Sequence, residues 1–164
     1  MSVGSSVPVQ FGDLLALARR SWIQRMAAGL REQGYPDYRR SDAAVCRLLL
    51  RGPVSLGRLG RILGVSRQAG RKVADGLVQR GLGEMRRDVR DSRRVNVHLS
   101  RRGQAYGHVV VAVVERLNRE VAIQAAPADL AAARRVLSLL SRPGDPLGQL
   151  AEDGSAEWSE PPGG

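Results

Sequence analysis

The chain has 164 residues, 43% of them hydrophobic, which suffices for one domain with a core or for a small domain with appended helices. Cys46 is the only cysteine, so an internal disulfide is excluded and a reducing compartment fits. The sequence has neither a run of about 18 apolar residues nor the start of a signal peptide, and we expect a cytoplasmic protein.

The net charge of +10 is concentrated in the middle third of the chain. Residues 52–103 hold thirteen Lys/Arg against four Asp/Glu, a local charge of +9, whereas residues 142–164 hold one Arg against five acidic residues, a local charge of −4. A basic field of this kind attracts polyanions, with nucleic acid first and anionic membrane second.

The first third of the chain is predicted to be helical after a flexible stretch over residues 1–9. Apolar residues recur at helical spacing over residues 10–33, and Gly34-Tyr35-Pro36 ends that pattern. A second helix, capped by Ser41, is predicted to run to about Arg51.

Two short helices joined by a tight turn come next. Ser55 is predicted to cap the first of them, which Gly64 ends. Ser66 is predicted to cap the second, over residues 67–80, and Gly81 closes it. Apolar and basic residues separate onto two faces of this second helix, so one face can pack while the other stays basic and exposed.

The hydrophobic period then changes from helical to alternating. Residues 82–87 and 95–99 are predicted strands, joined by a charged loop over residues 88–94. A long helix is predicted over residues 101–124, capped by Ser100, and a last helix from Pro127 to Leu140. The Pro, Gly and acidic residues that follow, 142–164, predict a disordered tail.

The order helix, turn, helix and hairpin is that of a helix-turn-helix followed by a β-wing. The second helix of such a pair fits the major groove of DNA, with its first residues nearest the base edges. Arginine can bind guanine bidentately, glutamine can do so with adenine, and lysine suits phosphate. The predicted DNA-binding residues of this helix are Ser66, Arg67, Gln68, Arg71 and Lys72.

The hairpin loop adds Arg90, Arg93 and Arg94 to the predicted DNA-binding set. Arginine on a narrow hairpin can reach the minor groove, whose negative potential favours it. Asp88 and Asp91 either cap the turn or pair with a wing arginine. The alternative for the whole loop is a solvated hairpin without a ligand.

Gly70 lies within the second helix of the pair, residues 67–80, which is called the reading helix below because it is predicted to contact the bases. Glycine inside a helix lowers helix stability by roughly 1 kcal/mol relative to alanine. Either the backbone approaches the DNA groove closely at this position, or Gly70 packs against the preceding helix. Both interpretations stay open at this point.

Three segments, in order, resemble the MarR (multiple antibiotic resistance regulator) family. Residues 65–82, with Leu77-Val78-Gln79-Arg80-Gly81 near their end, resemble the family's recognition helix and its trailing Leu-x-x-(basic)-Gly. Asp88-x-Arg90-Asp91-x-Arg93 resembles the wing motif, and Leu99-Ser100-Arg101-Arg102-Gly103 resembles the Leu-Thr-x-x-Gly that follows it. The resemblance covers roughly residues 10–140.

The resemblance implies a mainly α fold with a small β-hairpin wing, over residues 10–141. It implies a winged helix-turn-helix lobe at about residues 41–100 and dimerisation helices at 10–33 and 101–141. A homodimer with two-fold symmetry would bind a pseudo-palindromic DNA site with half-sites about 10–10.5 bp apart.

The wing departs from the family pattern at Ser92, where many members have an arginine that reaches the minor groove. Arg90 or Arg94 can take over that contact. Arg93 is then expected to be structural, as the partner of Asp88 or Asp91.

Family members often bind small phenolic or lipophilic effectors between the dimer helices and the winged lobe. Side chains that could line such a pocket here, or form plain core instead, are Trp22, Met26, Tyr35, Tyr38 and Val45. Binding there would shift the spacing of the two recognition helices.

The remaining reactive residues predict no further chemistry. Cys46 could be a redox switch, but an inert buried thiol is the interpretation we favour. One cysteine with two separated histidines, His98 and His108, makes a poor metal set, so we expect neither metal nor cofactor. No catalytic signature is present, and we expect no enzyme.

The first hypothesis is therefore a sequence-specific transcriptional regulator, a repressor more than an activator, that binds double-stranded DNA as a homodimer and is released by an effector. The alternatives are a non-specific architectural DNA-binding protein and a winged helix that binds an acidic protein partner. Competition with random DNA and salt-sensitive binding separate the three.

Overall fold

The computed structural model describes residues 9–89, 91 and 93–140. The predicted flexible N-terminus, except Val9, and the acidic tail over residues 142–164 lie outside the described residues. The described elements are, in chain order, α1 (Phe11–Glu32), α2 (Arg40–Leu49), β1 (Val54–Ser55), α3 (Leu56–Ile62), α4 (Arg67–Gln79), β2 (Gly83–Arg87), β3 (Val95–Leu99), α5 (Arg101–Gln124) and α6 (Pro127–Leu140).

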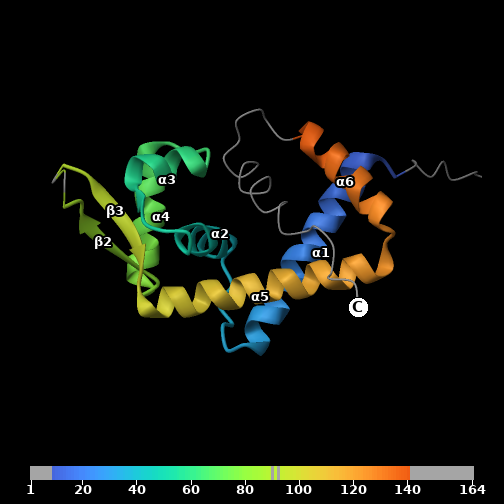
Figure 1. The fold of residues 1–164 in the computed structure, drawn as a ribbon, viewed down its shortest axis with the longest axis horizontal. Coiled ribbons are helices and arrows are strands. Elements are labelled where there is room, and N and C mark those ends of the chain that lie inside the picture. The colour runs from blue at the N-terminus through green and yellow to red at the C-terminus, as the bar shows by residue number, and fades with distance from the viewer. Residues whose placement is uncertain (1–8, 90, 92, 141–164) are drawn as a thin grey trace, which may run out of the picture.

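The long helix α5 runs along the molecule and connects its two ends (Figure 1). At one end lie α3, α4 and the hairpin of β2 and β3, and at the other end lie α1 and α6. Helix α2 packs on α5 between the two ends. This is the mainly helical fold with a small hairpin that the sequence predicts.

The sheet has three antiparallel strands in the order β1-β3-β2. Val97 of β3 lies opposite Val54 on one side and Met85 on the other, and its side chain is fully buried. The strand β1 is not among the predicted strands, because a two-residue strand is recognisable only by the strand with which it pairs.

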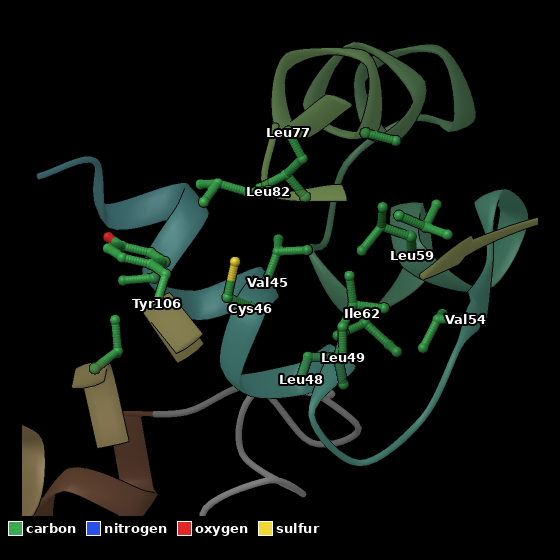
Figure 2. Close-up of a cluster of buried hydrophobic side chains, with 14 of the residues drawn as sticks. Val45, Cys46, Leu48, Leu49, Val54, Leu59, Ile62, Leu77, Leu82 and Tyr106 are labelled. Carbon is green, nitrogen blue, oxygen red and sulfur yellow. The ribbon is translucent and has the colours of Figure 1, made fainter. Parts of the chain in front are cut away.

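One cluster of aliphatic side chains fills the lobe made by α2, α3, α4 and the sheet (Figure 2). Val45, Leu59, Leu77 and Val97 are each fully buried in it. Each such side chain contributes on the order of 1.5–3 kcal/mol to folding. The cluster therefore fixes α4 in the lobe by its apolar face.

The three predicted serine caps next to the winged lobe are confirmed. The Oγ atoms of Ser55, Ser66 and Ser100 each accept a hydrogen bond from the backbone N–H three residues ahead, at 3.3, 3.2 and 2.9 Å. The predicted cap of the second helix is wrong: α2 begins at Arg40, and Arg39, in an extended conformation, is its N-cap.

The terminal helices expose much of their apolar surface. Helix α6 has no buried residue, and in α1 the residues that are buried lie near its C-terminal end. Ion pairs of Arg25 with Glu120 and of Arg116 with Glu32 join α1 to α5. The exposed large apolar side chains of the two helices are Phe11, Leu14, Leu15, Leu17, Val136, Leu137, Leu139 and Leu140.

Candidate nucleic-acid interface

The turn between α3 and α4 has the conformation that the sequence predicts. Gly64 has φ of +63°, in the left-handed region that favours glycine. Ser66 follows in extended conformation, and its Oγ accepts from the backbone N–H of Ala69 at 3.2 Å. The first turn of α4 is thus capped by a serine, as in many helices.

Of the two interpretations of Gly70, the structure supports packing against the preceding helix α3. It is buried, and a Cβ atom at this position would come within 2.8 Å of Gly60 Cα. Gly60 belongs to α3, so the two helices cross in contact at two glycines. The close approach at Gly70 is therefore between helices of the lobe, and this face of α4 is turned away from solvent.

The polar face of α4 carries the predicted reading residues, and all of them are exposed: Ser66, Arg67, Gln68, Arg71 and Lys72. The apolar face, with Ala74 and Leu77, is fully buried. The basic start of α4 therefore faces solvent. The helix cannot rotate about its axis without exposing Ala74 and Leu77, which are buried in the core.

Arg71 is the one reading residue with an ion pair inside its own helix. Its Nε lies 3.7 Å from a carboxylate oxygen of Asp75, one turn further on, and its side chain is 60% exposed. A contact of this length on an exposed face is weak. The pair orients Arg71 along the helix and leaves most of its guanidinium donors free for a ligand.

Two acidic residues hold the described part of the wing loop. Asp88 accepts from the side-chain amide of Asn96 at 2.8 Å and from the backbone N–H of Asp91 at 3.2 Å. Asp91 accepts from the backbone N–H of Arg93 at 3.0 Å and pairs with Arg94 Nε at 3.2 Å. Asp88 and Asp91 therefore both cap the turn, and Asp91 also pairs with an arginine.

The arginine partner of Asp91 is Arg94, so the expectation that Arg93 would fill this role is wrong. Arg93 is bonded to Asp91 through its backbone only, and its side chain is exposed. The reason is register, because Arg94 stands three residues after Asp91 across the tight turn. Arg90 and Ser92, the other wing positions of the prediction, lie outside the described residues.

The structure adds an ion pair that the sequence did not reveal. Asp42 at the start of α2 is 2% exposed and accepts two hydrogen bonds of 2.6 Å from Nε and Nη2 of Arg80, the C-cap of α4. The pair joins the end of the reading helix to α2. Its members are 38 residues apart, so no local pattern connects them, although Arg80 is the basic residue of the Leu-x-x-(basic)-Gly motif.

The predicted effector residues are divided between three environments. Trp22, Met26 and Tyr38 line one cavity of about 200 Å³ between α1, α2 and α5. Tyr35 lines a different cavity, and Val45 is fully buried in the core. Within the described residues the five side chains do not surround one pocket: Val45 belongs to the core, which was the stated alternative, and Tyr35 lies past the end of α1.

Cys46 is fully buried, as predicted for an inert thiol. Burial, with a smaller contribution from the Asp42 carboxylate, raises the pKa of Cys46 to about 12. Within the described part of the chain, no three His, Cys, Asp or Glu side chains gather as metal ligands. No helix among the described ones is long and apolar enough to cross a bilayer.

The sequence matches no protein-family model and no curated protein. The structure, however, is similar to solved regulators. A probable transcriptional regulator from Pseudomonas aeruginosa is 25% identical, with a TM-score of 0.65 over 80% of this chain and 97% of that one.

Two further similar structures hold ligands. A mutant of MarR from E. coli complexed with operator DNA is 20% identical, with a TM-score of 0.66 over 79% of this chain and 91% of that one. The PcaV transcriptional regulator from Streptomyces coelicolor, in complex with its natural ligand, is 18% identical, with a TM-score of 0.66 over 82% and 96%. The chain thus has the winged helix fold of the MarR-family regulators, and the resemblance seen in its motifs is confirmed in its architecture.

Proposed function

We propose that this chain is a DNA-binding transcriptional regulator of the MarR type, which acts in the cytoplasm as a homodimer on a pseudo-palindromic operator. The observation that carries the proposal is the first turn of α4. Its Arg67, Gln68, Arg71 and Lys72 are exposed while Gly70 and Leu77 hold the opposite face in the lobe. A basic helix face on a fixed support is what the major groove accepts.

The wing supports the same function. Arg93 and Arg94 are exposed on a loop whose turn is held by Asp88 and Asp91. Hydrogen bonds that hold Arg93 and Arg94 in place reduce the conformational entropy that these two residues lose on binding, and the minor groove attracts arginine. Arg93, whose side chain is turned to solvent, is the better candidate for this contact than Arg94, which is paired with Asp91.

The homodimer is proposed from the terminal helices. Helices α1 and α6 expose eight large apolar side chains, which a second copy of the same helices would cover. We assign residues 10–33 and 101–141 to dimerisation and about 41–100 to DNA binding. Two lobes related by a two-fold axis would contact half-sites about 10–10.5 bp apart.

The proposed regulation is repression by operator occupancy, relieved by a small effector. The cavity lined by Trp22, Met26 and Tyr38 lies between the helix α1 and the lobe, and Arg19, Arg40 and Arg47 also line it. Aromatic rings with three cations suit a small phenolic or acidic compound. Binding there would change the DNA affinity if it favours one spacing of the two lobes.

The experiment is selection of bound fragments from genomic DNA, followed by titration of the selected site against random DNA at several salt concentrations. Arg67→Ala and Arg71→Ala should each cost about 1–3 kcal/mol on the selected site and less on random DNA. Lys72→Ala should weaken both DNAs equally and lower the salt slope by about 0.9.

Arg39→Ala is the matched control, since it removes one exposed arginine that lies outside α4 and outside the segments assigned to DNA binding and dimerisation. It should change neither affinity nor preference. Equal affinity of the wild-type protein for selected and random DNA would favour the non-specific architectural function. Unchanged site preference in both α4 arginine variants would refute the assignment of the reading helix.

A further inference from the structure

A second cavity, of about 430 Å³, is separate from the proposed effector pocket. The α1–α2 loop, the start of α2, the C-terminal end of α4, the turn before β2 and the first turns of α5 surround it. It shares no lining residue with the smaller cavity. Its volume is within the range of small-molecule sites, about 300–1,000 Å³.

Tyr106 lines this cavity and carries an unsatisfied polar atom. The residue is 3% exposed, and its hydroxyl has no hydrogen-bond partner among the described residues. Figure 2 shows the hydroxyl at the edge of the aliphatic cluster, pointing away from Leu59 and Ile62. Burial is the main cause that raises the pKa of this phenol, so it stays a neutral donor at physiological pH. A buried hydroxyl without a partner is costly unless a ligand supplies an acceptor.

The charges around the cavity are balanced but not all paired with each other. Asp42 and Arg80 neutralise one another, and Arg80 uses only Nε and Nη2 in that pair, so donors on Nη1 remain. Arg102 and Asp37 also line the cavity, are both exposed, and form no ion pair among the described residues. An anion would be repelled by Asp37, and a cation by Arg102.

We propose that this cavity binds a small zwitterion, namely a free amino acid with an apolar side chain. The carboxylate accepts hydrogen bonds from Arg102 and the Tyr106 hydroxyl, and the ammonium group pairs with Asp37. The side chain packs on Leu82 and on Tyr35, whose ring meets that of Tyr106 edge to face at 5.1 Å. The two charges of this ligand match Arg102 and Asp37, the two exposed charged lining groups that form no ion pair among the described residues.

The test is calorimetric titration of the full chain, without DNA, with L-phenylalanine. Two compounds of the same shape serve as chemical controls: 3-phenylpropionate lacks the ammonium group, and phenethylamine lacks the carboxylate. Both should bind about tenfold more weakly than L-phenylalanine, since each loses one charge-assisted contact. Because no DNA is present, the result does not depend on whether the chain binds an operator.

Three variants locate the site. Arg102→Gln should weaken L-phenylalanine about tenfold, and Asp37→Asn should make L-phenylalanine and 3-phenylpropionate bind equally. Tyr106→Phe should weaken binding while leaving thermal stability unchanged or higher, because it removes the orphan hydroxyl and keeps the ring. A purely structural tyrosine would not give that combination.

Arg19→Gln is the matched control, because Arg19 lines only the smaller cavity. It should leave the affinity for L-phenylalanine unchanged. The proposal is overturned by absence of binding at millimolar L-phenylalanine or L-leucine, by either control compound binding as tightly as L-phenylalanine, or by an effect of Arg19→Gln larger than that of Arg102→Gln.

Discussion

The winged lobe and the terminal helices use apolar residues in opposite ways. In the lobe, Leu59, Leu77 and Val97 are fully buried by other parts of the same chain. In α1 and α6, Leu14 and Leu139 remain 57% and 84% exposed. The lobe can therefore fold on its own contacts, whereas the terminal helices gain most of their stability only when another surface covers them.

The largest effect is expected inside the lobe. Leu59→Ala removes a fully buried side chain from α3 and should lower the free energy of unfolding by about 2–5 kcal/mol. Urea unfolding at several protein concentrations measures this loss, which should be the same at each. Leu17→Ala, at a position 58% exposed, is the control and should change stability by less than about 0.5 kcal/mol in dilute solution. If the loss for Leu59→Ala depended on protein concentration, the lobe would not be stabilised by its own contacts alone.

The next largest effect is expected at the ion pair between Asp42 and Arg80, which joins the end of α4 to α2. Asp42→Ala leaves Arg80 partly buried without its carboxylate and should cost about 3 kcal/mol. Thermal or urea unfolding measures it. Asp37→Ala removes a carboxylate from the neighbouring loop, where the residue is exposed, and should be nearly neutral. Equal costs for the two variants would show that the ion pair does not stabilise the lobe.

Two glycines of the helix-turn-helix should respond with opposite signs. Gly70→Ala places a Cβ within 2.8 Å of Gly60 Cα and should cost about 1–3 kcal/mol, because backbone atoms must separate. Gly57→Ala, in α3, meets nothing within 4 Å and should stabilise by about 0.5–1 kcal/mol through helix propensity. Differential scanning calorimetry of both variants gives the sign. Stabilisation by Gly70→Ala would mean that the two helices are not in contact.

The smallest effect on the isolated chain is expected in α1. Leu14→Asp should leave the unfolding of the dilute chain unchanged and weaken self-association at least about tenfold, because it would place a charge in the covered face. Sedimentation velocity over a concentration series measures the association. Val89→Asp, on the exposed wing, is the control and should not change it. A dimer unaffected by Leu14→Asp would require a different interface.

What could be predicted from the sequence is what local chemistry determines. The serine caps at Ser55, Ser66 and Ser100 and the turn glycines Gly64 and Gly81 act within one helical turn, and each was found where it was predicted. The polar and apolar faces of α4 follow from its period alone.

What could not be predicted depends on contacts between distant segments. The bond from Arg80 to Asp42 crosses 38 residues, and β1 exists only because Val54 pairs with Val97. The wing was predicted as a hairpin loop whose acidic residues either cap the turn or pair with an arginine, but which arginine faces Asp91 is set by the three-dimensional turn and not by composition. The cavity next to Tyr106 is lined by residues from α2, α4, α5 and the turns between the elements, and no local sequence pattern indicates it.

The contact between Gly60 and Gly70 limits how the protein can adapt to a partner. At this crossing a Cβ on Gly70 would lie 2.8 Å from Gly60 Cα, so no side chain fits between α3 and α4 that could let them slide past each other. The two helices must move as one rigid unit. Any adjustment of α4 to an irregular surface therefore has to come from a hinge outside this pair, such as the glycine at position 52 before β1, with φ of +135°, and not from tilting α4 within it.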